Sequence, residues 1–209
     1  MVAGSISVLP PRLDGEHVVL DARTRLAALA AGGPEIPRIL AEVAGRVTAP
    51  APATLASEIA AGDGASPLLT LLLAMDSEVE SAGTRWPLDE VLDDRAGRHR
   101  AADVVRVRWL DLAAYDAVTR APGEPPILCV AVARPVSGGR REFRVALGGY
   151  GTRPVLVEPL ILGDGYDVEA AAKAAGRLYA TAADERAAGP IRSETATVLT
   201  RRLLGEIFA

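Results

Sequence analysis

Cysteine, histidine and lysine are scarce in this chain, and the first two shortages each exclude a class of site. Cys129 is the only cysteine among 209 residues, and it lies in the apolar run 127–133. An iron–sulfur cluster needs several thiolates, so this chain does not hold one alone. His17 and His99 are the only histidines, and neither has a second ligand at a metal-binding spacing. We therefore predict no metal site, a core position for Cys129 and surface positions for both histidines.

Long apolar runs and an excess of positive charge are also missing. The longest apolar stretch, 68–75, is far shorter than the roughly 18 residues that span a bilayer. The first residues lack the basic and apolar regions of a secretion signal. The net charge of −4 and the pI of about 5.3 give no electrostatic basis for binding nucleic acid. We expect a cytoplasmic protein with no nucleic-acid or membrane partner.

Residues 54–79 contain the clearest local pattern. The Asp63-Gly64 pair is typical of a turn, and Ser66-Pro67 is typical of a helix N-cap followed by proline at the first helical position. The apolar run 68–75 follows, and 78–82 then alternates as a strand does. The stretch therefore predicts a loop, a buried helix and a strand.

The residues of this stretch also resemble segments of a known family. Segments 54–60, 62–68 and 72–79 read TLASEIA, GDGASPL and LLAMDSEV. They resemble T-I-G-G-N-I-A, A-D-P-A-S-D-L and A-L-L-A-L-D-A-x-V in the flavin subunit of molybdenum hydroxylases, the family of carbon monoxide dehydrogenase and xanthine dehydrogenase. Further along, GGYG at 148–151 and the segment 191–204 resemble the family's L-G-G-V-G and Y-R-x-x-x-A-x-V-L-V-R-R-A-L. The resemblance implies an FAD-binding oxidoreductase subunit that passes electrons between iron–sulfur clusters and an external acceptor, beside molybdopterin and iron–sulfur subunits.

Three residues carry the implied cofactor site. Thr54, Asp63 and Ser66 are the polar positions that match the family's FAD-binding segments. The resemblance implies FAD as the cofactor, and it assigns these three residues to it. No triad, metal cluster or acid–base pair is present, because Asp184-Glu185 are adjacent and suit one site poorly. We therefore assign no catalytic residue and leave open whether the chain is itself an enzyme.

The remaining positions of the implied site depart from the family. Ala56 and Ser57 stand in place of the paired glycines, Glu58 in place of the asparagine and Pro67 in place of the second aspartate. Glycines allow backbone N–H groups to approach a diphosphate, whereas Glu58 adds a negative charge beside it. The family's upstream subdomain, with its glycine-rich loop, also has no counterpart in the first twenty or so residues. We predict that this chain alone does not hold FAD tightly.

The pattern of the whole chain predicts an α+β fold. We expect residues 1–95 to form a truncated FAD-binding-type domain. We expect residues 103–209 to form the C-terminal domain of the flavin-subunit family, a sheet of three or four strands backed by two or three helices. Expected strands are 6–9, 17–20, 78–82, 104–109, 127–133 and 141–147, with turns at 14–15 and 137–139. Expected helices are 21–31, 37–47, 67–75, 86–92, 167–182 and 193–208. Asp167 and Ser193 are expected to cap the last two helices, and Leu178 of the first of them is expected to face inward.

Other charged or glycine-rich segments allow two interpretations each. Arg106 and Arg108 suit either an anionic ligand or an exposed strand face, and the run 93–100 suits either a docking site or a solvated loop. The cluster at 148–151 is interpreted as a turn, because no helix follows it.

Three functional hypotheses remain at this level. The chain is a flavin subunit in electron transfer, a flavin-free structural or interaction subunit that packs against partner chains, or a degenerate product without a role. A loss of covering structure upstream would expose apolar surface, so we expect self-association or a partner chain over the face near residues 1–30.

Overall fold

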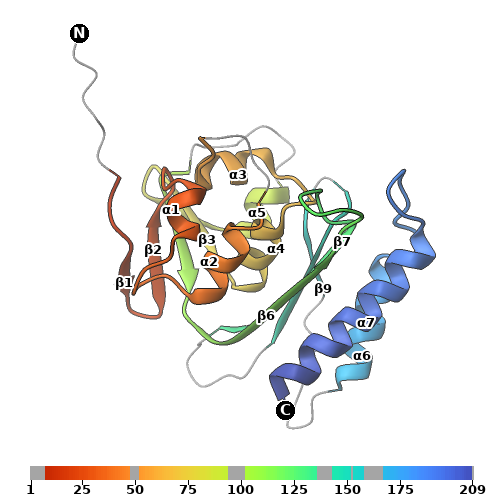
Figure 1. Cartoon of the computed structure of the whole chain (residues 1–209). Coiled ribbons are helices and arrows are strands. Elements are labelled where there is room, and N and C mark those ends of the chain that lie inside the picture. Colours follow the sequence, from red (N-terminus) through yellow and green to blue (C-terminus); the bar gives the residue numbers. More distant parts are fainter. Residues whose placement is uncertain are drawn as a thin grey trace.

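The computed structural model describes residues 8–47, 52–93, 102–135, 143–151, 153–157 and 167–208. Within them the chain forms two antiparallel sheets, with helices against both (Figure 1). This arrangement confirms the α+β fold expected from the sequence.

The first sheet has five strands in the order β1-β2-β5-β3-β4. The strands are β1 (Arg12–Asp14), β2 (His17–Asp21), β5 (Val104–Arg108), β3 (Glu78–Ser81) and β4 (Thr84–Pro87). The turn at Gly15, which has a φ of 60°, joins β1 to β2 and fits the Asp-Gly turn expected there. The helices beside this sheet are α1 (Leu26–Ala30), α2 (Arg38–Ala44), α3 (Leu55–Ala61), α4 (Pro67–Ala74) and α5 (Leu88–Asp93).

The second sheet has four strands in the order β6-β7-β8-β9. They are β6 (Leu110–Val118), β7 (Leu128–Pro135), β8 (Arg144–Gly148) and β9 (Val155–Val157). Helices α6 (Val168–Leu178) and α7 (Gly189–Phe208) pack against each other and lie along the outer face of this sheet (Figure 1). The expected small sheet backed by helices is therefore confirmed.

Strand β7 separates two hydrophobic cores. Ala131 and Ala133 face the core that contains α4 and the inner face of the first sheet. Val130 and Val132 face the core formed with α6 and α7. Alternate side chains of a strand point to opposite faces, so a strand covered on both faces is apolar throughout. This geometry explains why 127–133 is apolar at every position.

Helix α4 is the buried helix at the centre of the first core. Every residue of α4 is buried, as expected for a helix that is apolar on all sides. It begins where the sequence predicts, with Ser66 as N-cap and Pro67 at the first helical position. The helix packs on both β7 and β8, so it contacts the second sheet as well as the first half of the chain.

Several local expectations are wrong. Residues 55–61, expected as loop, form α3, and Asp21 ends β2 instead of opening a helix. Residues 86–87 belong to β4. Helix α7 begins at Gly189, so Ser193 lies inside it and does not cap it.

Two further corrections concern exposure. Leu178, expected to face inward, is 46% exposed. His17, expected at the surface, is partly covered, and its Nε2 is buried without a hydrogen-bond partner.

Strands β6 and β9 were not expected at all. Residues 6–7 of the first expected strand, the charged run from 94 onward with His99, and the expected turn at 137–139 lie outside the described residues.

The division into residues 1–95 and 103–209 stays a prediction. Strand β5 pairs with β2 and β3, so residues 104–108 are part of the first sheet. This pairing favours a boundary after Arg108, where β5 ends and β6 enters the second sheet.

Candidate functional site

The three residues assigned to the cofactor lie in one short segment, 54–66, which we call the α3–α4 corner. Thr54 is the N-cap of α3, where its side chain accepts a hydrogen bond from the Ser57 N–H at 3.2 Å. The Ser57 hydroxyl in turn accepts from the Thr54 N–H at 2.8 Å, so the two residues form a capping box. Ser57 is therefore the partner of both the side chain and the N–H group of Thr54.

The backbone donors at the start of α3 are already in use. Free N–H groups in the first turn of a helix are what an anionic ligand would bind. The first four N–H groups of α3 all donate within the chain: Leu55 to the Thr24 carbonyl at 3.0 Å, Ala56 to the Ala22 carbonyl at 2.7 Å, Ser57 to Thr54 Oγ1 at 3.2 Å and Glu58 to the Thr54 carbonyl at 3.0 Å. None of these four groups is free for a phosphate.

Asp63 and Ser66 shape the turn between α3 and α4. Asp63 Oδ1 accepts from the Ala65 N–H at 2.9 Å, and the Asp63 carbonyl accepts from the Ser66 N–H at 3.0 Å. Ser66 Oγ accepts from the Leu69 N–H at 3.1 Å as the N-cap of α4. These bonds are those of a turn and a cap, formed by the chain without any ligand.

Glu58 brings a carboxylate into the same corner. The Ser66 hydroxyl donates to Glu58 Oε1, which links the last turns of α3 to the first turn of α4. Burial raises the pKa of Glu58, the hydrogen bond from Ser66 opposes this, and the charge of Asp63 adds to the rise. A bound anion would meet the carboxylates of Glu58 and Asp63, which repel it.

These contacts determine whether the corner has hydrogen-bond donors available for the diphosphate of a dinucleotide. The donors at the start of α3 have acceptors, the Ser66 hydroxyl has an acceptor, and two carboxylates stand close by. The described residues of the corner therefore do not fit the diphosphate of FAD.

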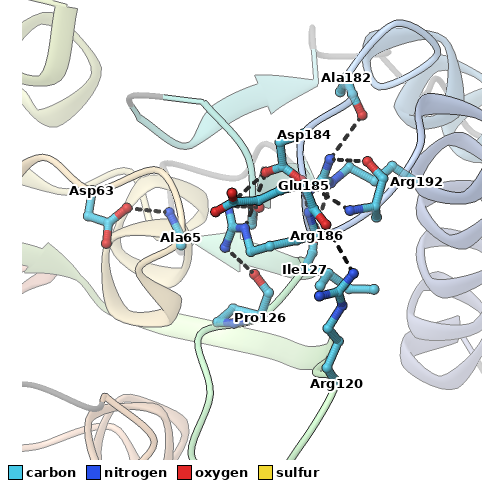
Figure 2. Close-up of polar contacts among 12 residues, drawn as sticks. Asp63, Ala65, Arg120, Pro126, Ile127, Ala182, Asp184, Glu185, Arg186 and Arg192 are labelled. Atoms are coloured by element: carbon cyan, nitrogen blue, oxygen red, sulfur yellow. Dashed lines mark hydrogen bonds and ion pairs between the residues drawn. The ribbon is translucent and has the colours of Figure 1, made fainter.

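A polar cluster that sequence reasoning missed lies between the second sheet and α7 (Figure 2). Arg192 is fully buried and uses four of its five N–H donors: to the carbonyls of Ile127 at 2.9 Å, Ala182 at 3.1 Å and Ala187 at 2.9 Å, and to Asp184 Oδ1 at 2.7 Å. An arginine in a helix is ordinarily exposed to solvent. The only signal in the sequence was the match of 191–192 to the family's Y-R.

Asp184 holds this cluster together. Burial alone would raise the pKa of Asp184, but the hydrogen bonds from Arg192 and from two backbone N–H groups outweigh it, so the pKa falls below its usual value. The guanidinium of Arg192 also lies over the Tyr150 ring, 4.8 Å from its centroid. Asp184 is thus a structural ion-pair partner of Arg192.

Arg106 and Arg108 have carboxylate partners in β1 and in the turn before β3. Arg106 Nη1 donates to Asp14 Oδ2 at 2.9 Å, and its side chain is 6% exposed. Arg108 Nε lies 3.1 Å from Asp76 Oδ2. Both positive charges are neutralised inside the chain, which favours the structural interpretation of these arginines over an anionic ligand.

Cys129 is fully buried, as expected from its apolar run. Burial raises the pKa of its thiol to about 11, against the opposing hydrogen bond with Thr70. A protonated, inaccessible thiol is a core residue and not a nucleophile.

An open cleft of about 520 Å³ lies elsewhere on the molecule, between α2 and the crossover from β5 to β6. Trp109 and Leu112 form one wall, and Ile36 and Ile39 form the other. The cofactor candidates do not line this cleft. Among the described residues, no group of three or more possible metal ligands converges. No helix there combines the length and apolar character that a membrane crossing requires.

Neither a protein-family model nor a curated protein sequence matches the chain. Three solved structures with similar chains are a carbon monoxide dehydrogenase from Hydrogenophaga pseudoflava that lacks the Mo-pyranopterin moiety of the molybdenum cofactor, a reconstituted CO dehydrogenase from Oligotropha carboxidovorans and quinoline 2-oxidoreductase from Pseudomonas putida 86. The first is 24% identical with a TM-score of 0.78, covering 95% of this chain and 77% of that chain. The second is 19% identical with a TM-score of 0.76, and the third 18% with 0.75; each covers 96% of this chain and 78% of the other. At these identities the likeness shows that the chain shares its fold with chains of these molybdenum hydroxylase structures.

Proposed function

We propose that this chain is a flavin-subunit-like component of a molybdenum-hydroxylase-type assembly, and that it does not bind FAD tightly itself. Its likeness to chains from CO dehydrogenase and quinoline 2-oxidoreductase structures supports the first part. The observation that carries the second part is the α3–α4 corner, where the first four N–H groups of α3 donate to the chain's own acceptors.

The expected loss of affinity for FAD is large enough to support a flavin-free role. Ala56 and Ser57 in place of two glycines, Glu58 in place of an asparagine and Pro67 in place of an aspartate are three separate losses. Each lost charge-assisted or buried contact costs about 1–3 kcal/mol, so the three together cost about 3–9 kcal/mol if they add. Every 1.4 kcal/mol is about tenfold in affinity, so FAD would bind at least about a hundredfold more weakly.

A flavin-free component of this fold would act by packing against partner chains. We propose molybdopterin and iron–sulfur subunits in the cytoplasm as those partners, with self-association as the alternative. The exposed apolar residues Val8, Leu9 and Leu13 are 45%, 62% and 53% accessible. They lie at or beside β1, an edge strand of the first sheet, so this face is the proposed contact surface.

The first test is an absorption spectrum of the purified chain followed by a titration with FAD. We expect a colourless protein and no saturation at micromolar FAD. A yellow protein with two flavin bands, at close to one FAD per chain, would refute the flavin-free proposal. It would restore the electron-transfer role that the fold likeness also favours.

The second test addresses the partners. The tagged chain would be co-expressed with a molybdopterin subunit and an iron–sulfur subunit, then purified and sized by light scattering. We expect a complex that weakens when Leu9 and Leu13 are both replaced by Ser. Thr195→Ser, on the outer helix α7, is the matched control. A monomer without bound partners would contradict the packing role.

A further inference from the structure

Gly149 is fixed by both of its backbone polar groups. Its N–H donates to the Gly64 carbonyl at 2.7 Å, and its own carbonyl accepts from Arg186 Nη2 at 2.9 Å. Its φ of 100° favours glycine, and an added Cβ would lie 2.6 Å from the Leu128 nitrogen. The loop after β8 therefore sits between the α3–α4 corner on one side and a C-terminal arginine on the other.

The backbone of the corner lies against this loop with no room for a side chain at Gly64. A Cβ at Gly64 would lie 2.7 Å from the Tyr150 carbonyl and closer still to that of Gly151. Gly64 is buried, and Ala65 and Ser66 beside it are 6% and 4% exposed. The position of the loop thus limits which conformations the corner can take.

Arg186 is oriented by its own neighbours (Figure 2). Its Nε donates to Asp184 Oδ2 at 3.2 Å and its Nη1 to the Pro126 carbonyl at 3.3 Å. The other oxygen of Asp184 accepts from the buried Arg192 at 2.7 Å. Arg192 therefore holds Asp184, and Asp184 holds Arg186, so that the Nη2 group of Arg186 points at the Gly149 carbonyl. All three residues lie in α7 or in the segment that leads into it.

We propose that Asp184, Arg186 and Arg192 form a C-terminal latch that holds the Gly148–Gly151 loop on Gly64 and so keeps the α3–α4 corner in one conformation. The latch supplies from within the chain the order that a bound cofactor would supply, and this last clause rests on the flavin-free function proposed above. Arg186 is a positioning residue, because it acts on the corner only through Gly149.

The test is amide hydrogen exchange on the full chain without added ligand. We expect Arg186→Ala to speed exchange about tenfold or more at Gly149 and at the Ala65 and Ser66 amides of the corner, because a charge-assisted bond is lost. Amides within α6 should keep their wild-type rates. Arg177→Ala, which removes an exposed arginine of α6, should leave both segments unchanged.

Faster exchange at both the loop and the corner supports the latch. Faster exchange at the loop alone, or at neither, overturns it. If Arg186→Ala unfolds the chain, Arg186→Lys decides, because lysine keeps the charge beside Asp184 but lacks the fork that reaches Gly149 and Pro126 together. The FAD spectrum is a separate readout: a yellow wild-type protein refutes the flavin-free function, whereas the coupling between loop and corner is judged by exchange alone.

Discussion

Replacing Arg192 by Met should cost this protein a large part of its stability. Methionine keeps an unbranched apolar stem but removes the donors that Arg192 supplies to the carbonyls of Ile127, Ala182 and Ala187 and to the Asp184 carboxylate. Removing one partner of a buried ion pair costs about 3–5 kcal/mol. Asp184 is 25% exposed and regains some hydration, so we expect about 3–4 kcal/mol. Domains of this kind have about 5–15 kcal/mol in total.

The assay is urea unfolding followed by far-UV circular dichroism and by tryptophan fluorescence. With a slope of about 2–3 kcal/mol/M, the midpoint should fall by about 1–2 M. Trp86 lies in β4 of the first sheet and Trp109 directly after β5, so fluorescence follows the first sheet, whereas circular dichroism also follows α6 and α7 on the second sheet. Coincident transitions would show that the two cores unfold together.

The matched control for Arg192→Met is Arg201→Met on the same helix. Arg201 is 44% exposed and pairs with Glu169 at 2.7 Å, and exposed pairs contribute at most about 1 kcal/mol. If Arg192→Met costs no more than this control, the buried network does not hold the C-terminal half together and our reasoning fails.

The pH dependence of the Arg192 effect gives a second check. Because the pKa of Asp184 is lowered in the folded chain, its contribution is present above its unfolded value of about 3.8 and is lost as the pH falls through the folded value. The difference between wild type and Arg192→Met should therefore narrow as the solution is acidified below about pH 4.

Two other substitutions test the α3–α4 corner. Gly64→Ala would press a Cβ against the carbonyl of Gly151, so we expect urea unfolding to show that the free energy of unfolding falls by about 2 kcal/mol or more. At Gly205, in the last turns of α7, an added Cβ meets nothing within 4 Å. Gly205→Ala should therefore raise the free energy of unfolding by about 0.5–1 kcal/mol. Equal effects at the two glycines would contradict the close backbone contact. Because burial raises the pKa of Glu58, ionisation of Glu58 costs stability, and that cost grows as the pH rises above its unfolded value. Glu58→Gln should therefore raise the melting temperature at pH 7 and flatten its fall between pH 4 and 7, whereas Glu194→Gln on α7 should do neither; a lower melting temperature for Glu58→Gln would refute this account.

Local sequence signals were sufficient for several elements. Ser66-Pro67 before an apolar run fixed the start of α4, because the cap and the proline act within one turn of the helix. Ala196, Leu199 and Leu203 recur at helical spacing and are buried in α7. The run 127–133 is apolar on both faces, which predicted a central strand, and β7 lies between β6 and β8.

For other elements the sequence pattern led to a different prediction from the structure that forms. Thr54 and Ser57 form a capping box that opens α3, but the segment had been interpreted through its resemblance to a ligand-binding loop. The expectation that Thr54, Asp63 and Ser66 bind a cofactor remains a prediction, and each side chain has a structural partner in the corner. Strand β6 carries no clean alternation, because it is an edge strand and most of its residues are half-buried.

Only the tertiary structure decided how the corner is closed and where Arg192 lies. The partners of Arg192 come from residues 127, 182, 184 and 187, and no pattern within α7 reveals that these acceptors converge on one guanidinium. Gly64 and Gly149 are 85 residues apart in the chain and share a hydrogen bond of 2.7 Å. Periodicity and capping act over one or two turns of chain, so they determine which segments become helix or strand. Contacts between distant segments depend on how the two sheets pack around α4, and this packing commits the polar groups of the corner to the chain itself.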